Sequence, residues 1–223
     1  MGAHFGNLQK IKNGKRRYGI TPHIPGGFTT PKTLMKIADV AQKYKGVIKI
    51  TSGQRILITN LREEDLESIW NELGMKPAVT NQYSVKNVEM CPAEFCKRSK
   101  RNSIAIGMKI SKNFHGMPLP NRTKIGVAGC RNACTSVYSK DIGVIADTDG
   151  YIVTCGGSAG FHQRLSDIIA QKLNEKEAFD LVKNILEYYN ENADMGEKLG
   201  FFIDRIGVDK FKCDVLKRAN INL

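Results

Sequence analysis

The sequence contains no long apolar segment. None of its hydrophobic runs approaches the roughly 20 residues needed to cross a bilayer, and the N-terminal segment MGAHFGNLQKIKNGKRRYG has no apolar stretch of the kind found in signal peptides. Acidic residues are few as well, since 22 Asp and Glu stand against 34 Lys and Arg, giving a formal net charge of +12. We therefore expect a cytoplasmic protein with no membrane partner, whose surface attracts something anionic.

Aromatic residues are also scarce. They make up 8% of the chain and do not interleave with the basic runs, as a platform for single-stranded nucleic acid requires. The sequence shows no nicotinamide or flavin fingerprint, no internal repeat and no low-complexity tract. Nucleic acid is therefore not the expected partner, and any redox chemistry is expected to draw its electrons from a separate protein.

Residues 1–78 are predicted to form a small first domain. One helix begins after Thr30, which precedes Pro31 as an N-cap residue, and ends before Gly46; a second ends at Gly74. Strands are expected at 16–22, 47–50, 55–59 and 76–80. The resulting order β-α-β-β-α-β is that of a ferredoxin-like, split βαβ domain.

Residues 79–223 are predicted to form a second domain of mixed α/β structure, which makes the whole chain α+β. The segments KIGVAGC, DIGVIA and YIVTCGG have the apolar character of strands, and a tight turn, DTDG, joins the last two. The range 176–192 carries apolar residues at helical spacing. This domain also contains all the cysteines.

Four of the six cysteines form two pairs. Cys91 and Cys96 lie in MCPAEFC, and Cys130 and Cys134 lie in CRNAC. Four thiolates are what one [4Fe-4S] cluster takes. Structural zinc also takes four ligands, although its pairs are usually closer and often include histidine, and unliganded thiols are a third alternative. The spacing alone leaves these three alternatives open, while the other two cysteines, Cys155 and Cys213, have no motif partner and are interpreted as structural.

Several blocks in order resemble one family. IGVAGCRNACTSVYSKDIGVIA is similar to the cluster-binding motif of the sirohaem-dependent sulfite and nitrite reductases, in which a Cys-x3-Cys pair precedes a D-I-G strand. HIPGGFTTPKTLMKIADVAQKYKGVIKITSGQRILITNL resembles the ferredoxin-like half domain of that family. VKNVEMCP, GYIVTCGGSAG and GEKLGFFIDRIGVDKF resemble later blocks, so the likeness covers roughly residues 18–212.

The resemblance implies a set of metal ligands. Cys91, Cys96, Cys130 and Cys134 would hold a [4Fe-4S] cluster, and Cys134 would also bridge to the sirohaem iron. The first pair is Cys-x4-Cys here, whereas the family more often has five intervening residues. This departure concerns the geometry of the first loop more than the identity of the ligands.

The resemblance also implies cationic side chains that face the substrate anion. The matching positions are His23, Lys86, Arg122 and Lys124. Lysine at 86, where the family commonly has arginine, keeps the charge but loses the planar fork that grips an oxyanion. Arg122 and Lys124 stand two residues apart, so on a strand they would share one face. Lys124, where related nitrite reductases tend to have asparagine, slightly favours sulfite.

Sirohaem is a polycarboxylate, which offers a physical reason for the positive charge of the chain. The candidates for binding it are Lys49, Gln54, Arg55, Asn132, Gly156, Gly157, Ser158 and Arg164. The basic run KRSKR at 97–101 is interpreted as solvated, with haem carboxylates and an acidic electron donor as the alternative contacts.

These features predict an oxidoreductase that reduces sulfite to sulfide, or nitrite to ammonia, with six electrons from a donor protein such as a ferredoxin. A non-catalytic sirohaem and iron–sulfur protein for electron transfer or sensing is the alternative, and a zinc-containing nucleic-acid-binding protein is a third. Larger family members hold two copies of the unit that occurs once here. We therefore expect a homodimer in which a second copy supplies some of the substrate-facing side chains.

Overall fold

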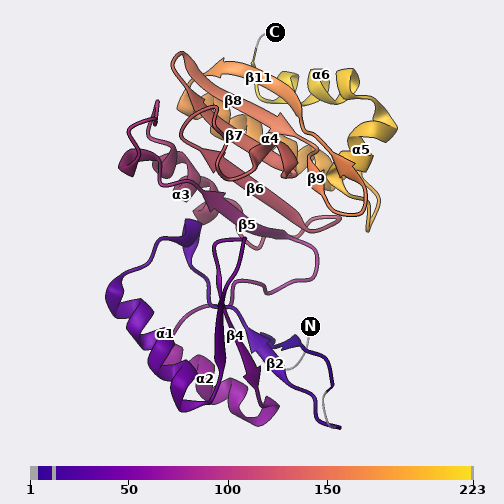
Figure 1. The fold of residues 1–223 in the computed structure, drawn as a ribbon. Helices are drawn as coiled ribbons and strands as arrows, with labels where there is room; N and C mark the ends of the chain where they lie inside the picture. Colours follow the sequence, from indigo (N-terminus) through magenta and orange to yellow (C-terminus); the bar gives the residue numbers. More distant parts are fainter. Residues whose placement is uncertain (1–4, 12–13, 222–223) are drawn as a thin grey trace. The chain divides into compact units, whose positions relative to one another are not determined.

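The computed structural model describes residues 5–11 and 14–221. Its contacts divide the chain into two compact units, one ending at Gln82 and the other beginning at Tyr83, which appear in Figure 1 in indigo to magenta and in magenta to yellow. Among the described residues, no helix combines the length and the apolar character needed to span a membrane.

The first unit is a small antiparallel sheet covered by two helices. Its elements are β1 (Asn7–Leu8), β2 (Tyr18–Ile20), η2 (Pro25–Gly27), α1 (Pro31–Lys43), β3 (Val47–Ile50), β4 (Ile56–Leu61), η3 (Glu63–Asp65) and α2 (Leu66–Leu73). The strand order is β1-β2-β4-β3. Apolar side chains such as Ile37, Ile58 and Ile69 are fully buried between the helices and the sheet.

The helix ends of the first unit follow the sequence signals. The Thr30 side chain accepts a hydrogen bond from the Thr33 backbone N–H at 3.1 Å, which satisfies a donor in the first turn of α1. Gly74 ends α2 in the left-handed conformation. The trailing strand expected at 76–80 is wrong, because the described backbone there forms only an isolated bridge between Pro77 and Pro22. Proline has no N–H to donate to a ladder.

The second unit is built on a five-stranded mixed sheet in the order β11-β8-β7-β6-β5. Strands β5 (Val85–Met90), β6 (Thr123–Ala128) and β7 (Ile142–Asp147) are parallel, and β8 (Gly150–Cys155) and β11 (Asp167–Leu173) are antiparallel to their neighbours. The remaining elements are η4 (Ala93–Phe95), α3 (Ser103–Phe114), η5 (Val137–Ser139), β9 (Ser158–Ala159), β10 (Gln163–Arg164), α4 (Glu175–Asn192), α5 (Leu199–Ile206) and α6 (Val208–Arg218).

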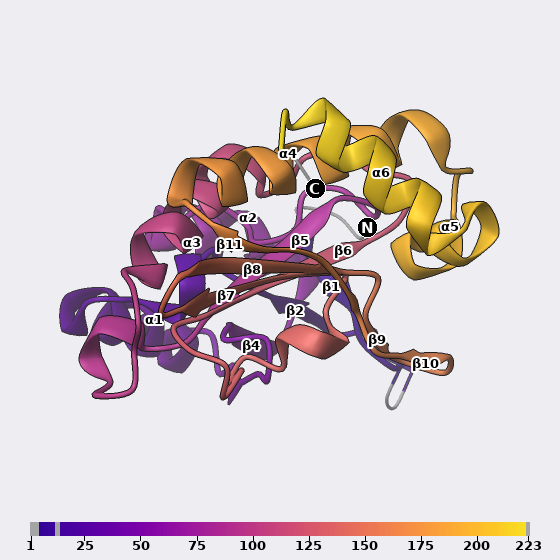
Figure 2. The same cartoon turned by 90° about the horizontal axis from the view of Figure 1, so that it is seen from above.

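The two faces of this sheet have different coverings. Helices α3 and α4 pack on one face, and α5 and α6 lie on that same side, above the sheet in Figure 2. The opposite face is covered by the segment that contains η5, drawn in salmon below the sheet. Val137 of η5 packs there against Ala128, Ile145 and Ile152 in a small apolar cluster. The segment that follows Cys134 is therefore attached directly to the sheet.

Two glycines allow this close attachment. A Cβ at Gly126 would lie 2.9 Å from Val137 Cγ1, and one at Gly143 would lie 3.2 Å from Val137 Cβ. Any larger residue at these two positions of β6 and β7 would push η5 away from the sheet.

Candidate metal centre and anion pocket

The two cysteine pairs follow the carboxyl ends of two neighbouring parallel strands. In the β5–β6 ladder Met90 is paired with Val127, so Cys91, directly after β5, and Cys130, just after β6, begin loops at the same edge of the sheet. The Cys91 backbone N–H donates to the Val127 carbonyl at 3.1 Å and extends the ladder to the cysteine. The fold thus brings together two segments that are 33 residues apart in sequence.

The two loops touch at Gly129. Its backbone N–H donates a hydrogen bond to Cys91 Sγ at 3.0 Å, and its carbonyl accepts one from the Lys100 N–H at 2.8 Å. A Cβ at this position would lie 2.8 Å from Ser99 Oγ and 3.1 Å from Ala93 Cβ. Only glycine lets the loop after β6 approach the loop after β5 this closely, and its N–H fixes the position of the Cys91 sulfur through the hydrogen bond.

The loop that contains Cys130 and Cys134 is stabilised by one contact within the loop and by one contact to β7. The Asn132 side-chain amide donates to Cys134 Sγ at 3.1 Å. Arg131, between the two cysteines, forms an ion pair with Asp147 at the end of β7, with Nε and Oδ2 2.5 Å apart. That contact keeps the pKa of Asp147 below its usual value. Asn132, predicted as a cofactor contact, therefore lies against one of the predicted cluster ligands.

The chemistry of this donor set fits a [4Fe-4S] cluster. Cys91 is buried, Cys130 is half-buried, and Cys96 and Cys134 are exposed, so the four thiols run from the base of the loops to their surface. Among the described residues, no three His, Cys, Asp or Glu side chains are grouped around one metal-ion position. A cluster does not require such a group, because each of its four cysteines binds a different iron.

A basic pocket of about 240 Å³ lies at the other end of β6. Arg122 and Lys124 both line it, with the buried Thr123 between them, as the alternation along a strand predicts. The other lining residues are Ser139, Lys140, Asp141, Gly157, Ser158, Ala159, Gly160 and Lys198. The structure therefore brings together four of the predicted site residues: Arg122, Lys124, Gly157 and Ser158.

The pocket also contains charged residues that the sequence did not point out. Lys140 Nζ lies 2.7 Å from Glu89 Oε2, in an ion pair whose two side chains are largely buried. Asp141 Oδ2 accepts the Lys124 backbone N–H at 2.8 Å. Burial raises the pKa of Asp141 to about 6, although that hydrogen bond and the charges of Lys198 and Lys124 act in the opposite direction. Lys140 stands six residues after Cys134 and directly before the D-I-G strand, and this proximity to the motif was its one signal in the sequence.

Two other predicted residues of this unit have partners within the protein. Arg164 Nη2 lies 2.6 Å from Asp167 Oδ2 and 2.9 Å from Asp204 Oδ1, and Nη1 donates to the Gly156 carbonyl at 3.2 Å. It thus stabilises the segment that follows β8. Lys86 is buried within β5, with 9% of its surface exposed. Their roles towards a cofactor or a substrate remain predictions.

The remaining predicted residues belong to the first unit. Gln54 and Arg55 lie in the turn between β3 and β4, and a Cβ at Gly27 would lie 3.0 Å from Gln54 Cβ, so this turn packs on η2. Burial lowers the pKa of His23, and the charges of Arg55 and Lys76 lower it further, which favours a neutral imidazole. The side chain of Lys49 is exposed on β3.

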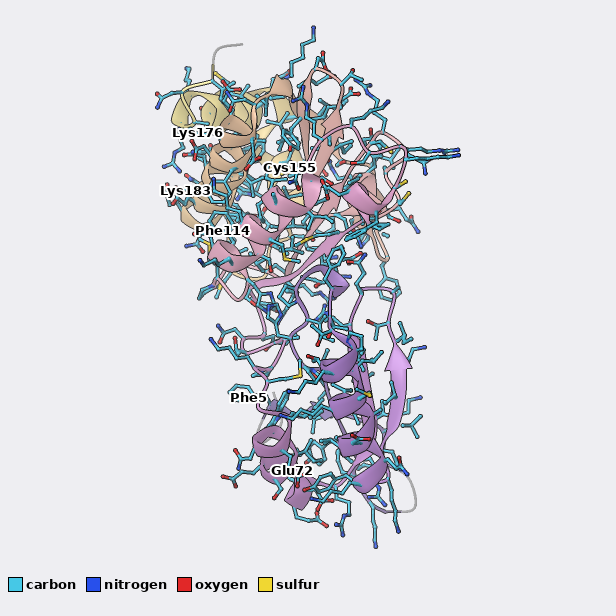
Figure 3. The ribbon with its side chains drawn as sticks, turned by 90° about the vertical axis from the view of Figure 1, so that its left-hand side faces the viewer. Phe5, Glu72, Phe114, Cys155, Lys176 and Lys183 are labelled. Carbon is cyan, nitrogen blue, oxygen red and sulfur yellow. The ribbon has the colours of Figure 1, made fainter. Side chains whose placement is uncertain are left out.

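One residue of the basic run at 97–101 is fixed by hydrogen bonds to the backbone. Arg101 donates from Nε to the Asp147 carbonyl at 2.8 Å and from Nη2 to the Thr148 carbonyl at 2.7 Å, which attaches it to the turn after β7. Lys97 and Arg98 are exposed beside Cys96. Cys155 is fully buried inside the second unit, as Figure 3 shows, and burial keeps the pKa of its thiol well above the usual value. These properties are those of an unreactive thiol with a structural role.

Comparison with known proteins identifies both units. Residues 85–223 match the nitrite and sulphite reductase 4Fe-4S domain, and residues 9–76 match the nitrite/sulfite reductase ferredoxin-like half domain. The chain is 30% identical over 208 residues to an assimilatory-type sulfite reductase of Nitratidesulfovibrio vulgaris, covering 92% of this chain and 95% of that protein. It is 31% identical over 210 residues to the nitrite reductase [NAD(P)H] of Bacillus subtilis, covering 92% of this chain but only 26% of that protein.

Solved structures share the fold. The crystal structure of dissimilatory sulfite reductase I matches with a TM-score of 0.77 at 14% identity, over 93% of this chain and 70% of that one. The structure of Mycobacterium tuberculosis NirA matches with a TM-score of 0.79 at 15% identity, over 93% of this chain and 41% of that one. The chain therefore belongs to the nitrite and sulphite reductase family, and its cofactors are a [4Fe-4S] cluster and sirohaem.

Proposed function

We propose that this protein is an oxidoreductase that reduces sulfite to sulfide, or nitrite to ammonia, in a six-electron reaction. The single observation that carries the proposal is the basic pocket in which Arg122 and Lys124 lie side by side at one end of β6. The two cysteine loops begin at the opposite edge of the sheet, after β6 and after its parallel neighbour β5. On this proposal, one unit supplies both the ligands of the redox centre and the site for the small anion.

The residues of the chain have distinct tasks in this reaction. The bound cofactors supply the electrons. Arg122 and Lys124 attract the anion and fix its orientation, because a guanidinium and an ammonium together offer several charge-assisted hydrogen bonds to oxyanion oxygens. Each oxygen leaves as water and needs protons, and we assign their donation to Lys124, which lines the pocket.

The choice between the two substrates follows from Lys124. Sulfite carries more negative charge than nitrite, so a second full positive charge beside Arg122 favours sulfite. A cytoplasmic location and a separate electron donor are parts of the proposal. The exposed Lys97 and Arg98 beside Cys96 offer an acidic donor, such as a ferredoxin, a complementary surface close to the cluster.

Steady-state kinetics test the reaction and the role of the pocket. Anaerobically purified protein that contains iron, acid-labile sulfide and sirohaem is expected to oxidise a reduced viologen dye with sulfite and nitrite. Arg122→Gln and Lys124→Met are each expected to lower kcat/KM roughly 10- to 100-fold, because each removes a charged hydrogen bond. Lys183→Met is the control, since Lys183 is on α4 (Figure 3), is not among the residues that line the pocket, and lies 3.8 Å from its partner Glu187.

The same assay decides between the proposal and its alternative. Loaded protein that reduces neither anion would contradict the proposal and favour a non-catalytic electron-transfer or sensor protein. Equal losses in Lys183→Met and the pocket variants would show that the pocket is not the substrate site.

We further propose that the working form is a homodimer. The pocket and the cysteine loops are separated by the length of β6, which at about 3.3 Å per residue is about 20 Å, so a second copy is well suited to present its basic residues to the cluster of the first. Light scattering is expected to show a dimer that dissociates with loss of activity on dilution. A monomer with full activity would rule this arrangement out.

A further inference from the structure

The basic pocket includes a lysine from a distant part of the chain. Lys198 directly precedes α5, lies 64 residues after Cys134 and is half-buried. Its Nζ lies 3.7 Å from the position that a Cβ on Gly160 would occupy. Its side chain does not cap the helix, because α5 has no side-chain hydrogen bond at its N-cap. Lys198 instead lines the pocket, and its side chain has no role in starting the helix.

The position of Lys198 is fixed by close backbone contacts. A Cβ at Gly200 would lie 2.6 Å from the Gly156 carbonyl, so the first turn of α5 touches the segment after β8. The Gly156 N–H donates in turn to the Asp141 carbonyl at 2.8 Å. These contacts place the beginning of α5 next to the beginning of β7, where the Asp141 carboxyl lies.

We propose that Lys198 is a further anion-binding residue of the pocket, and that the Asp141 carboxyl beside it sets the net charge that the pocket offers to the anion. This inference rests on the proposed function in one respect, namely that the ligand of the pocket is a small oxyanion. It assigns a specificity role to the C-terminal helices, which lie outside the cysteine motifs.

The charges of the pocket support this role. Lys140 is neutralised by Glu89 in a largely buried ion pair, so it adds little net charge. Arg122, Lys124 and Lys198 then face one carboxyl group, that of Asp141. The pocket has a net charge of about +3 when Asp141 is protonated and about +2 when it is ionised. The pocket with protonated Asp141 therefore attracts an anion more strongly.

Anion binding should consequently depend on pH. The pKa of Asp141 is raised to about 6 by burial, so this carboxyl group ionises within an accessible range. An ionised Asp141 repels the anion, so affinity should fall as the pH rises through about 6. The groups that face Asp141 from the packed elements are Lys124 on β6, Cys155 on β8, Tyr189 on α4 and Lys198 before α5, with Lys140 adjacent in the chain.

The test measures nitrite binding to the loaded protein by calorimetry without reductant, together with KM and kcat in the dye assay. Nitrite stays a monoanion over this pH range, so its own protonation does not interfere. Lys198→Met is expected to raise the dissociation constant and KM about tenfold with little change in kcat, whereas Lys198→Arg should remain within about threefold of the original protein. Lys176→Met is the matched control, because Lys176 is on the first turn of α4 (Figure 3), is not among the residues that line the pocket, and pairs with Asp180.

The pH dependence gives a second readout. In the unmodified protein the dissociation constant for nitrite is expected to rise between pH 5 and 7, and Asp141→Asn should remove this rise while its amide oxygen still accepts the Lys124 N–H. A flat profile in the unmodified protein would overturn the role of Asp141 even if the variant does not fold. Melting temperatures of all variants separate loss of binding from loss of structure.

The outcomes distinguish this inference from the proposed function. If the protein reduces an anion but Lys198→Met binds nitrite as tightly as Lys176→Met, the inference about Lys198 is wrong and the proposed function stands. If the loaded protein reduces neither anion but binds nitrite in a Lys198-dependent way, the inference holds and the proposed function fails. A Lys198→Arg variant no better than Lys198→Met would also overturn the inference.

Discussion

Replacing Cys134 by serine or alanine is expected to remove the [4Fe-4S] cluster and with it the reductase activity. Cys134 is an exposed thiol at the end of the second pair, and the Asn132 amide N–H donates to its Sγ at 3.1 Å. A serine hydroxyl has a much higher pKa than a thiol and is a poor ligand for iron. Iron and acid-labile sulfide should fall to background, and kcat should fall by a factor on the order of 100 or more.

The control for this experiment is Cys213→Ser. Cys213 is half-buried on α6 and lies in the sequence far from both pairs, so its replacement should leave iron content, visible absorption and activity unchanged. Asn132→Ala should give an intermediate result, with a cluster that assembles but is lost more quickly in air, because the thiolate loses a hydrogen bond. Full iron content in Cys134→Ser, or equal loss in Cys213→Ser, would contradict the assignment of the ligands.

The elements predicted most accurately from sequence were those with local signals. The helix that begins after Thr30 and the one that ends at Gly74 are fixed by capping residues, which act over a few positions. Strand β5 was not predicted, because Lys86, Asn87 and Glu89 are polar yet buried. Such a segment does not show the alternation of apolar and polar residues by which a strand is recognised. The pairing of β5 with β6 is what brings the cysteine pairs together, and it is a long-range feature that no local pattern reveals.

The site shows the same division between local and long-range information. The shared face of Arg122 and Lys124 followed from the period of a strand, and the pocket contains both. Lys198 was missed because its place in the pocket depends on how α5 packs on the segment after β8. The ion pair of Arg164 with Asp204, 40 residues away, could not be predicted from the sequence either. It gives this arginine a structural role that the sequence did not suggest.

The second large effect is expected from Gly157→Ala. A Cβ at Gly157 would lie 2.5 Å from the Lys140 carbonyl oxygen and 2.6 Å from that of Tyr138. Both atoms belong to the backbone, which cannot rotate away as a flexible side chain can. The Tyr138 carbonyl also accepts the Ser166 N–H at 2.8 Å, so a shift of this backbone would disrupt a further hydrogen bond.

The added methyl group therefore forces the segment 138–140 away from the residues that follow β8. Overpacking of this kind costs about 1–3 kcal/mol, which for a chain of this size corresponds to a melting temperature lower by roughly 2–12 °C. Because Lys140 and Asp141 line the pocket, we also expect weaker anion binding. Circular dichroism of the loaded protein during heating measures the first effect, and calorimetry with nitrite measures the second.

Gly160→Ala is the matched control for this substitution. It lies three residues further along the same segment and also lines the pocket, but a Cβ there would meet only Lys198 Nζ at 3.7 Å and Ser158 Oγ at 3.8 Å, which are ordinary contacts. Its effect on the free energy of unfolding is expected to stay within about 0.5 kcal/mol. Equal melting temperatures for the two variants would show that the backbone around Tyr138 and Lys140 gives way easily. In that case the segment after the cysteines would not be held rigidly against the sheet, and the pocket would not be preformed.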